Sequence, residues 1–149
     1  MDKAEKIIKK LKLKPLEPEG GFFIETYRSK EKVKIGQKKK HLSTAIFYLL
    51  RKGNESKVHR LKSDEIYHFY LGDPVNLYLV YPDGKCEKRV LGNNILKGEL
   101  PQILIPKMTW QSAKLKRGGS FALLGTTVSP AFDFEDLEMK ENHSPTKNK

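Results

Sequence analysis

Hydrophobic and polar residues alternate with a period of two over most of the chain beyond residue 20. The alternating runs are rich in β-branched and aromatic side chains, which favour extended backbone. The pattern predicts ten strands, at residues 22–28, 42–51, 56–61, 65–71, 75–81, 85–91, 101–106, 109–115, 119–129 and 133–139. Turn signals such as Pro82-Asp83-Gly84 separate them. Short strands at this spacing predict an all-β sandwich or barrel.

The first residues follow a different period. Within residues 2–13 the apolar side chains recur at helical spacing while Lys fills the other face, and Asp2 stands where an N-cap is expected. Pro15 and Pro18 then end the helix. We therefore expect a short amphipathic helix, docked through its apolar positions Ala4, Ile7, Ile8 and Leu11.

Two segments lack an apolar period. The Lys-rich stretch 30–40 predicts a mobile loop, and the composition of residues 141–149 is that of a disordered basic tail. A chain of 149 residues has the usual length of one domain. We expect a single domain over residues 1–140, with a barrel from about residue 20 to 140.

The net charge of +11 at first suggests a nucleic-acid partner. The positive excess lies in residues 1–14, 28–40 and 142–149, so the strand-rich body is close to neutral. This distribution favours a solubilising surface and disfavours nucleic-acid binding as the function.

The lone Cys86 excludes an internal disulfide and is interpreted as structural. No apolar run is long enough for a membrane span, and we expect a soluble, cytoplasmic protein.

The densest group of ionisable side chains lies between residues 53 and 72. Gly53, His59, Glu65 and Gly72 fall on the spacing of the first cupin motif, with Leu61 at the position of the motif's second His. In this stretch the sequence resembles the cupin superfamily.

The second cupin motif is matched more loosely by residues 98–115. Pro106 takes the Pro position, Met108 replaces a Gly, Gln111 replaces the ligand His and Leu115 replaces an Asn.

Further runs along the chain resemble one branch of the superfamily, the DUF985 family. They are Pro18-Glu-Gly-Gly-Phe-Phe-Ile-Glu25-Thr-Tyr27-Arg28-Ser, Thr44-Ala-Ile-Phe-Tyr, and Val128 with Pro130, Phe132, Asp133 and Phe134. The resemblance covers about residues 11–138. It implies a double-stranded β-helix, or jelly-roll-like barrel, with an open pocket, and usually a homodimer. It does not define a reaction.

Strand alternation gives candidate site residues without the family. His59 and Glu65 both point inward if a tight turn at 62–64 joins their strands, which predicts an imidazole and a carboxylate in the barrel mouth as a candidate catalytic acid–base pair. The resemblance to the cupins implies a metal site of three His and one Glu; with Leu61 and Gln111 in place of two of these His, the remaining ligands would be His59, Glu65 and Gln111. This set predicts at most weak binding of a divalent metal, and no cofactor is required.

Strand positions an even number of residues apart face the same side of the sheet, so further side chains are expected in the candidate pocket. Those predicted to bind ligand are Glu25, Tyr27, Tyr67, Trp110, Gln111 and Phe132. The alternative for Glu25 is an edge strand where it pairs with a Lys. His68 has the opposite parity to Glu65 and is expected on the outer face of the sheet unless a bulge intervenes.

These residues favour a protein that binds a small polar molecule, sugar-like or carboxylated. A His and Glu pair that moves protons without a metal would make it an isomerase, epimerase or lyase. The alternative is a non-catalytic binding or sensor module that uses the same pocket. A metal-dependent enzyme is disfavoured by Leu61 and Gln111, and a nucleic-acid binder depends on the Lys-rich segments alone.

Overall fold

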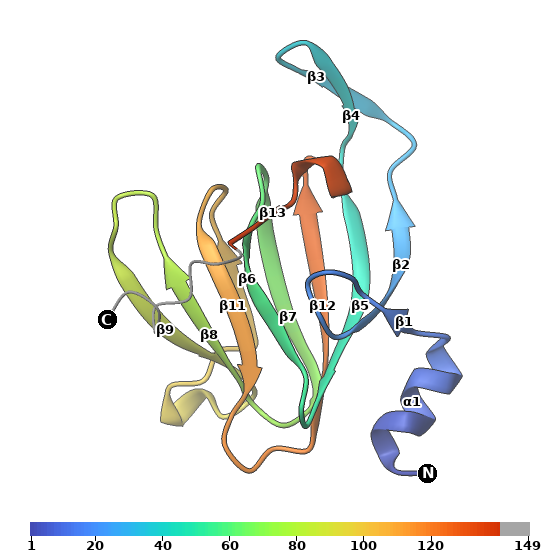
Figure 1. Cartoon of the computed structure of the whole chain (residues 1–149), viewed down its shortest axis with the longest axis vertical. Helices are drawn as coiled ribbons and strands as arrows, with labels where there is room; N and C mark the ends of the chain where they lie inside the picture. The colour runs from blue at the N-terminus through green and yellow to red at the C-terminus, as the bar shows by residue number, and fades with distance from the viewer. Residues whose placement is uncertain (141–149) are drawn as a thin grey trace.

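Two sheets packed face to face form the body of the protein (Figure 1), which the computed structural model describes for residues 1–140. The predicted tail at 141–149 lies outside the described residues. The larger sheet has the strand order β1 (Lys14–Pro15), β2 (Phe22–Arg28), β5 (Thr44–Arg51), β12 (Phe121–Ser129), β7 (Asp64–Gly72) and β10 (Gln102–Ile105). The smaller has the order β13 (Glu138–Met139), β6 (Glu55–Arg60), β11 (Trp110–Leu115), β8 (Val75–Val80) and β9 (Cys86–Leu91).

Consecutive strands from β5 to β8 alternate between the two sheets, and neighbours within each sheet run antiparallel. This is the jelly-roll arrangement of a double-stranded β-helix, so the predicted all-β fold is confirmed. Two short 3-10 helices, η1 (Ile95–Lys97) and η2 (Phe134–Asp136), lie in connecting segments.

The core fills the space between the sheets. Alternate residues of β7 and β8 point inward, as the period of two predicts: Tyr67, Leu77 and Leu79 are each at most 1% exposed. Facing side chains from β5, β10 and β12 complete the apolar centre, among them Leu50, Ile103, Ile105 and Leu124. Polar side chains replace apolar ones toward the open end, where the candidate site lies.

The N-terminal helix α1 (Lys3–Leu11) packs on the outer face of the larger sheet. The Asp2 side chain caps it by accepting a hydrogen bond from the backbone N–H of Glu5 at 2.8 Å. Its apolar face covers residues of β2, β5 and β12, including Phe22, Leu49 and Leu123. The predicted amphipathic helix is therefore confirmed. No helix in residues 1–140 is both long and apolar enough to cross a membrane.

The prediction of a mobile loop at residues 30–40 is wrong. This stretch is a hairpin of β3 (Lys32–Ile35) and β4 (Lys38–His41), which extends away from the body in Figure 1. Lys40 is only 9% exposed, and its ammonium group forms ion pairs with Asp133, at 2.9 Å, and Asp136. Because these partners come from the C-terminal segment, the local Lys-rich pattern gave no sign of them.

The last predicted strand is also corrected. Residues 133–139 form the 3-10 helix η2 followed by the two-residue strand β13, which pairs with β6. The carboxyl groups of Asp133 and Asp136 turn toward Lys40 here, and this long-range contact outweighs the local strand preference.

Lys40 and its neighbour Lys39 differ in burial, so their substitutions should have different effects. Lys40→Ala leaves Asp133 and Asp136 without their ammonium partner and should lower the free energy of unfolding by about 1–3 kcal/mol. Lys39→Ala, at an exposed position of the same strand, should change it by less than about 0.5 kcal/mol. Urea unfolding of both variants measures the difference, and equal effects would contradict the structural role of Lys40.

Candidate functional site

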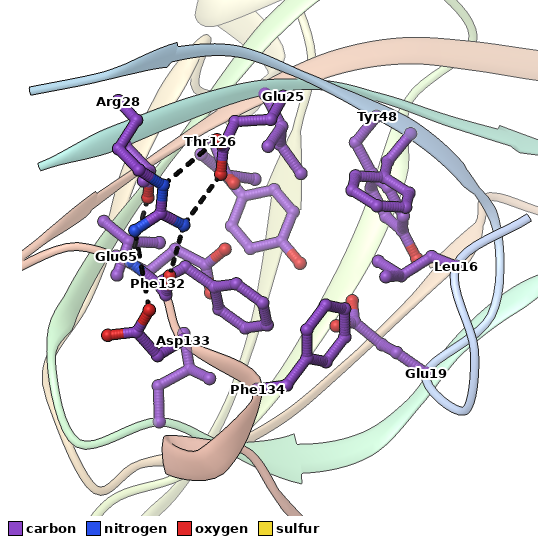
Figure 2. Close-up of a pocket in the computed structure, with 16 residues that line it drawn as sticks. Leu16, Glu19, Glu25, Arg28, Tyr48, Glu65, Thr126, Phe132, Asp133 and Phe134 are labelled. Atoms are coloured by element: carbon purple, nitrogen blue, oxygen red, sulfur yellow. Dashed lines mark hydrogen bonds and ion pairs between the residues drawn. The ribbon is translucent and has the colours of Figure 1, made fainter. Parts of the chain in front are cut away.

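A cavity opens on the inner face of the larger sheet, where the β1–β2 loop and the C-terminal segment cross it (Figure 2). Most of the wall is aromatic and aliphatic, with a few charged groups. The lining side chains are Leu16, Glu19, Phe23, Glu25, Arg28, Thr44, Ile46, Tyr48, Leu61, Glu65, Tyr67, Thr126, Val128, Phe132, Asp133 and Phe134.

Glu65 is the carboxyl group that β7 places in this wall. It is 7% exposed, and Gln111 on β11 donates a hydrogen bond from Nε2 to Glu65 Oε1 at 3.0 Å. Burial, reinforced by the charge of Glu19 and opposed by His59, raises the pKa of Glu65 to about 7. Both protonation states of this carboxyl are therefore populated near neutral pH.

A second carboxyl, Glu19, enters from the loop between β1 and β2. Its Oε2 accepts a hydrogen bond from Ser56 Oγ at 2.8 Å, and its backbone carbonyl accepts one from the N–H of Lys57 at 2.7 Å. Gly20 follows with φ +110°, and a Cβ there would lie 2.1 Å from the carbonyl oxygen of Glu55. Only glycine allows this close approach to β6, which carries the carboxyl group of Glu19 into the barrel.

His59 lies behind Glu19 and does not line the cavity. It is 1% exposed; its Nδ1 lies 2.7 Å from the carbonyl oxygen of Lys57, and its Nε2 lies 3.6 Å from Glu19 Oε1. Since a carbonyl only accepts, Nδ1 carries the hydrogen of that bond. The inward placement predicted for His59 and Glu65 is found, but the direct partner of the imidazole is Glu19.

The sequence reasoning did not select Glu19 because it lies in a loop, where alternation assigns no direction. The available signal was its position between Pro18 and the pair Gly20-Gly21 in the run that resembles the DUF985 family.

An ion-pair chain closes one side of the mouth. Arg28 binds both carboxylate oxygens of Glu25, at 2.9 and 3.1 Å, and donates to the carbonyl oxygen of Phe132 at 2.8 Å. It also approaches Asp133 at 3.5 Å. Burial opposes ionisation of Asp133, but hydrogen bonds and charge from Lys40 and Arg28 hold its pKa below the usual value. These contacts fix the segment whose rings, Phe132 and Phe134, point into the cavity in Figure 2.

Three predicted ligand-binding residues, Tyr27, Trp110 and Gln111, do not line the cavity. Tyr27 is 55% exposed, because a bulge in β2 pairs Glu25 with Ile46 but Tyr27 with the next residue, Ala45, which reverses the parity after Glu25. Arg28 faces the cavity instead. Glu25 does line the cavity; its cation is Arg28, while the alternative predicted a Lys.

Trp110 does not line the cavity either. Its ring lies under the guanidinium of Arg60, whose Cζ is 4.3 Å from the ring centroid, with the ammonium of Lys140 at 5.2 Å. Its neighbour Gln111 points inward and is 2% exposed. The prediction treated both as pocket wall, but adjacent residues of a strand face opposite sides of the sheet.

The remaining predictions on placement agree with the structure. Tyr67 and Phe132 line the cavity. His68 faces outward from the larger sheet, where its Nε2 lies 3.1 Å from Thr127 Oγ1 and its ring stacks on Tyr70 with centroids 6.3 Å apart.

The donor set does not fit a tightly bound metal ion. The structure of residues 1–140 contains no group of three His, Cys, Asp or Glu side chains placed to hold one. Leu61 lines the cavity with an apolar side chain, which cannot bind a metal ion. The amide nitrogen of Gln111 donates a hydrogen bond to Glu65 and has no lone pair to offer a metal ion. Weak metal binding by His59, Glu65 and Gln111 stays a prediction, and no chemical step is derived from it.

Comparison with known proteins assigns the fold to a family. The profile described as "Cupin superfamily (DUF985)" matches residues 5–140. Among solved structures, a hypothetical protein from Leishmania major has 29% identity and a TM-score of 0.91, covering 99% of this chain and 92% of that one. Protein SO0799 from Shewanella oneidensis has 34% identity and a TM-score of 0.87, covering 99% and 90%.

A yeast protein and a further solved structure are also similar to this chain. The uncharacterized Saccharomyces cerevisiae protein YML079W is 28% identical over 79% of this chain. The aligned part spans 66% of the length of the yeast protein. Oxalate decarboxylase from Bacillus subtilis has a TM-score of 0.59 at 13% identity, covering 86% of this chain and 30% of that one, and so shares the fold alone.

Because the pKa of Glu65 is raised, we expect the free energy of unfolding to fall as the pH rises. Its carboxyl has a usual value of 4.5 and a value of about 7 in the folded state, so the folded protein binds more protons between these limits. The stability that this group contributes is complete below pH 4.5 and is lost as the pH rises through 7. Relative to Glu65→Gln, the wild-type free energy of unfolding should fall by an amount on the order of 3 kcal/mol between pH 4 and 8. Urea unfolding across this range measures it; a constant difference would show that Glu65 is not desolvated.

Proposed function

We propose that this chain, which belongs to the DUF985 family of the cupin superfamily, binds a small polar organic molecule in its barrel cavity and exchanges protons with it. The observation that carries the proposal is the carboxyl group of Glu65, buried in an enclosed aromatic wall and facing the cavity. A group of pKa about 7 donates and accepts protons with nearly equal ease at neutral pH.

The wall favours a ligand with hydrogen-bond donors. The carboxylates of Glu19 and Glu65 accept hydrogen bonds, and the rings of Phe132 and Phe134 offer faces on which the apolar side of a sugar-like ring can pack. A carboxylated ligand fits less well, because Arg28 is the one basic residue in the lining and already binds Glu25 and Asp133.

The chemistry that suits this arrangement is proton transfer at a ligand carbon or oxygen, as in an isomerase, epimerase or lyase. Glu65 is the group that would take the proton from the ligand and return it. His59 is a positioning residue in this scheme, because it touches Glu19 and does not reach the cavity wall. A non-catalytic binding module would use the same cavity without any transfer of protons.

A homodimer, which the family resemblance implies, is part of the proposal. Its support in the structure is an exposed apolar group on β7 and β10, where Tyr70, Leu71 and Leu104 are 49%, 39% and 50% exposed. Sedimentation should give twice the chain mass of 17.1 kDa at micromolar concentration. A mass of 17.1 kDa would remove this part of the proposal.

Binding is tested by nuclear magnetic resonance on isotope-labelled protein. The probes are neutral monosaccharides, sugar acids and small amines, added separately. At least one class should shift the resonances of Thr126, Val128 and Phe132, and Ile46→Trp, which fills the cavity, should abolish the shifts. His68→Ala, on the outer face of the sheet, should preserve them. Binding that survives Ile46→Trp, or no binding from any class, would contradict the proposal.

Proton transfer is tested on the probe that binds. In D₂O, an isomerase or epimerase should exchange a carbon-bound hydrogen of the ligand for deuterium, and Glu65→Gln should lower the exchange rate by at least about 10²-fold. Binding without any exchange would identify the non-catalytic module instead.

A further inference from the structure

The charges of the cavity point to a narrower class of ligand. We infer that the cavity takes a small organic cation, a protonated amine, whose ammonium group lies between Glu19 and Glu65 and against the aromatic wall. The inference rests on the proposed function, since it concerns the same cavity and names its ligand class.

The first argument is the balance of charge. The lining contains four acidic side chains and one basic side chain. Arg28 forms an ion pair with Glu25, and Lys40, which lies outside the lining, forms one with Asp133. In the described part of the chain, neither Glu19 nor Glu65 has a Lys or Arg partner. Two desolvated carboxyls therefore face the cavity without a Lys or Arg partner among residues 1–140.

Neutral hydrogen-bond donors only partly replace the hydration that these two carboxyls lose on burial. Ser56 donates one hydrogen bond to Glu19, and Gln111 donates one to Glu65. His59 carries a charge only when it is protonated, and it approaches Glu19 from the side away from the cavity. A buried carboxylate is costly unless it is paired, so a cation in the cavity would be stabilised by both groups at once.

The second argument is the aromatic wall. Five aromatic side chains line the cavity: Phe23, Tyr48, Tyr67, Phe132 and Phe134. The rings of Phe132 and Phe134 meet edge to face, with centroids 4.9 Å apart and planes at 80°. Ring faces attract a cation within about 6 Å, and the attraction increases when the cation is shielded from water. An anion would be repelled, and a neutral ligand could donate hydrogen bonds to the two carboxyls but would bring no opposite charge to them.

The two arguments together fix how binding depends on pH. A cation beside Glu65 favours its charged form, so binding should release a proton and become tighter as the pH rises through 7. The groups that face Glu65 from the surrounding strands and loop are Glu19, Tyr48, His59, Tyr67, Gln111 and Thr126. Burial raises the pKa of Tyr48 and Tyr67 well above the usual value, so both phenols stay neutral in this pH range.

The experiment compares benzylamine with benzyl alcohol, which have the same ring and differ in charge. Calorimetric titration at pH 8 should show benzylamine binding at least about tenfold more tightly than the alcohol. At pH 5.5 that ratio should fall at least about threefold, while the affinity of the alcohol changes little. At pH 7, titration in two buffers of different ionisation enthalpy should show net proton release for the amine only.

Variants assign the effect to the cavity. Glu65→Gln keeps an acceptor for Gln111 and should remove most of the preference for the amine. Glu138→Gln makes the same chemical change outside the cavity, beside Arg60, and should leave the preference unchanged. The proton-release measurement uses the wild-type chain, so it decides the question even if Glu65→Gln fails to fold.

The outcomes separate this inference from the proposed function. Equal affinity for the two probes at pH 8, or an amine preference that survives Glu65→Gln, would overturn the inference. Binding of a neutral monosaccharide in the cavity without binding of benzylamine would overturn it and leave the proposed function standing. If no sugar, sugar acid or amine binds in the cavity, both fail.

Discussion

The burial of two carboxyl groups inside an otherwise apolar barrel is the constraint on which the site depends. Glu65 comes from the larger sheet, and the side chains that hold Glu19 come from the smaller one, so the pair exists only when the sheets are packed together. Neutral donors, Ser56 for Glu19 and Gln111 for Glu65, orient the two carboxyls but do not replace all the water they have lost. The raised pKa of Glu65 is the direct consequence.

The same constraint explains the two departures from the cupin metal motif. Leu61 makes the wall beside the carboxyls apolar, which strengthens their desolvation. Gln111 supplies an N–H donor where a metal ligand would have to accept, and it uses that donor to orient Glu65. Together these side chains place an apolar group and a hydrogen-bond donor where the cupin motif has imidazoles.

Much of the positive charge near the mouth has a structural role. Lys40 joins the β3–β4 hairpin to the C-terminal segment, and Arg28 joins β2 to the same segment. The rings of Phe132 and Phe134 are thereby held over the cavity by ion pairs from two directions. Charge that suggested a solubilising surface in the sequence therefore shapes the wall of the cavity.

The sequence by itself determined the features that depend on a local period. Alternation located the strands and placed Glu65 and Tyr67 inward and His68 outward, because successive side chains of a strand face opposite sides wherever the strand is regular. Tertiary structure decided the rest. One bulge reversed the direction of Tyr27, and a glycine that fits against β6 brought Glu19 into the barrel from a loop. Both results depend on contacts between segments distant in the chain, which no local pattern of residues records.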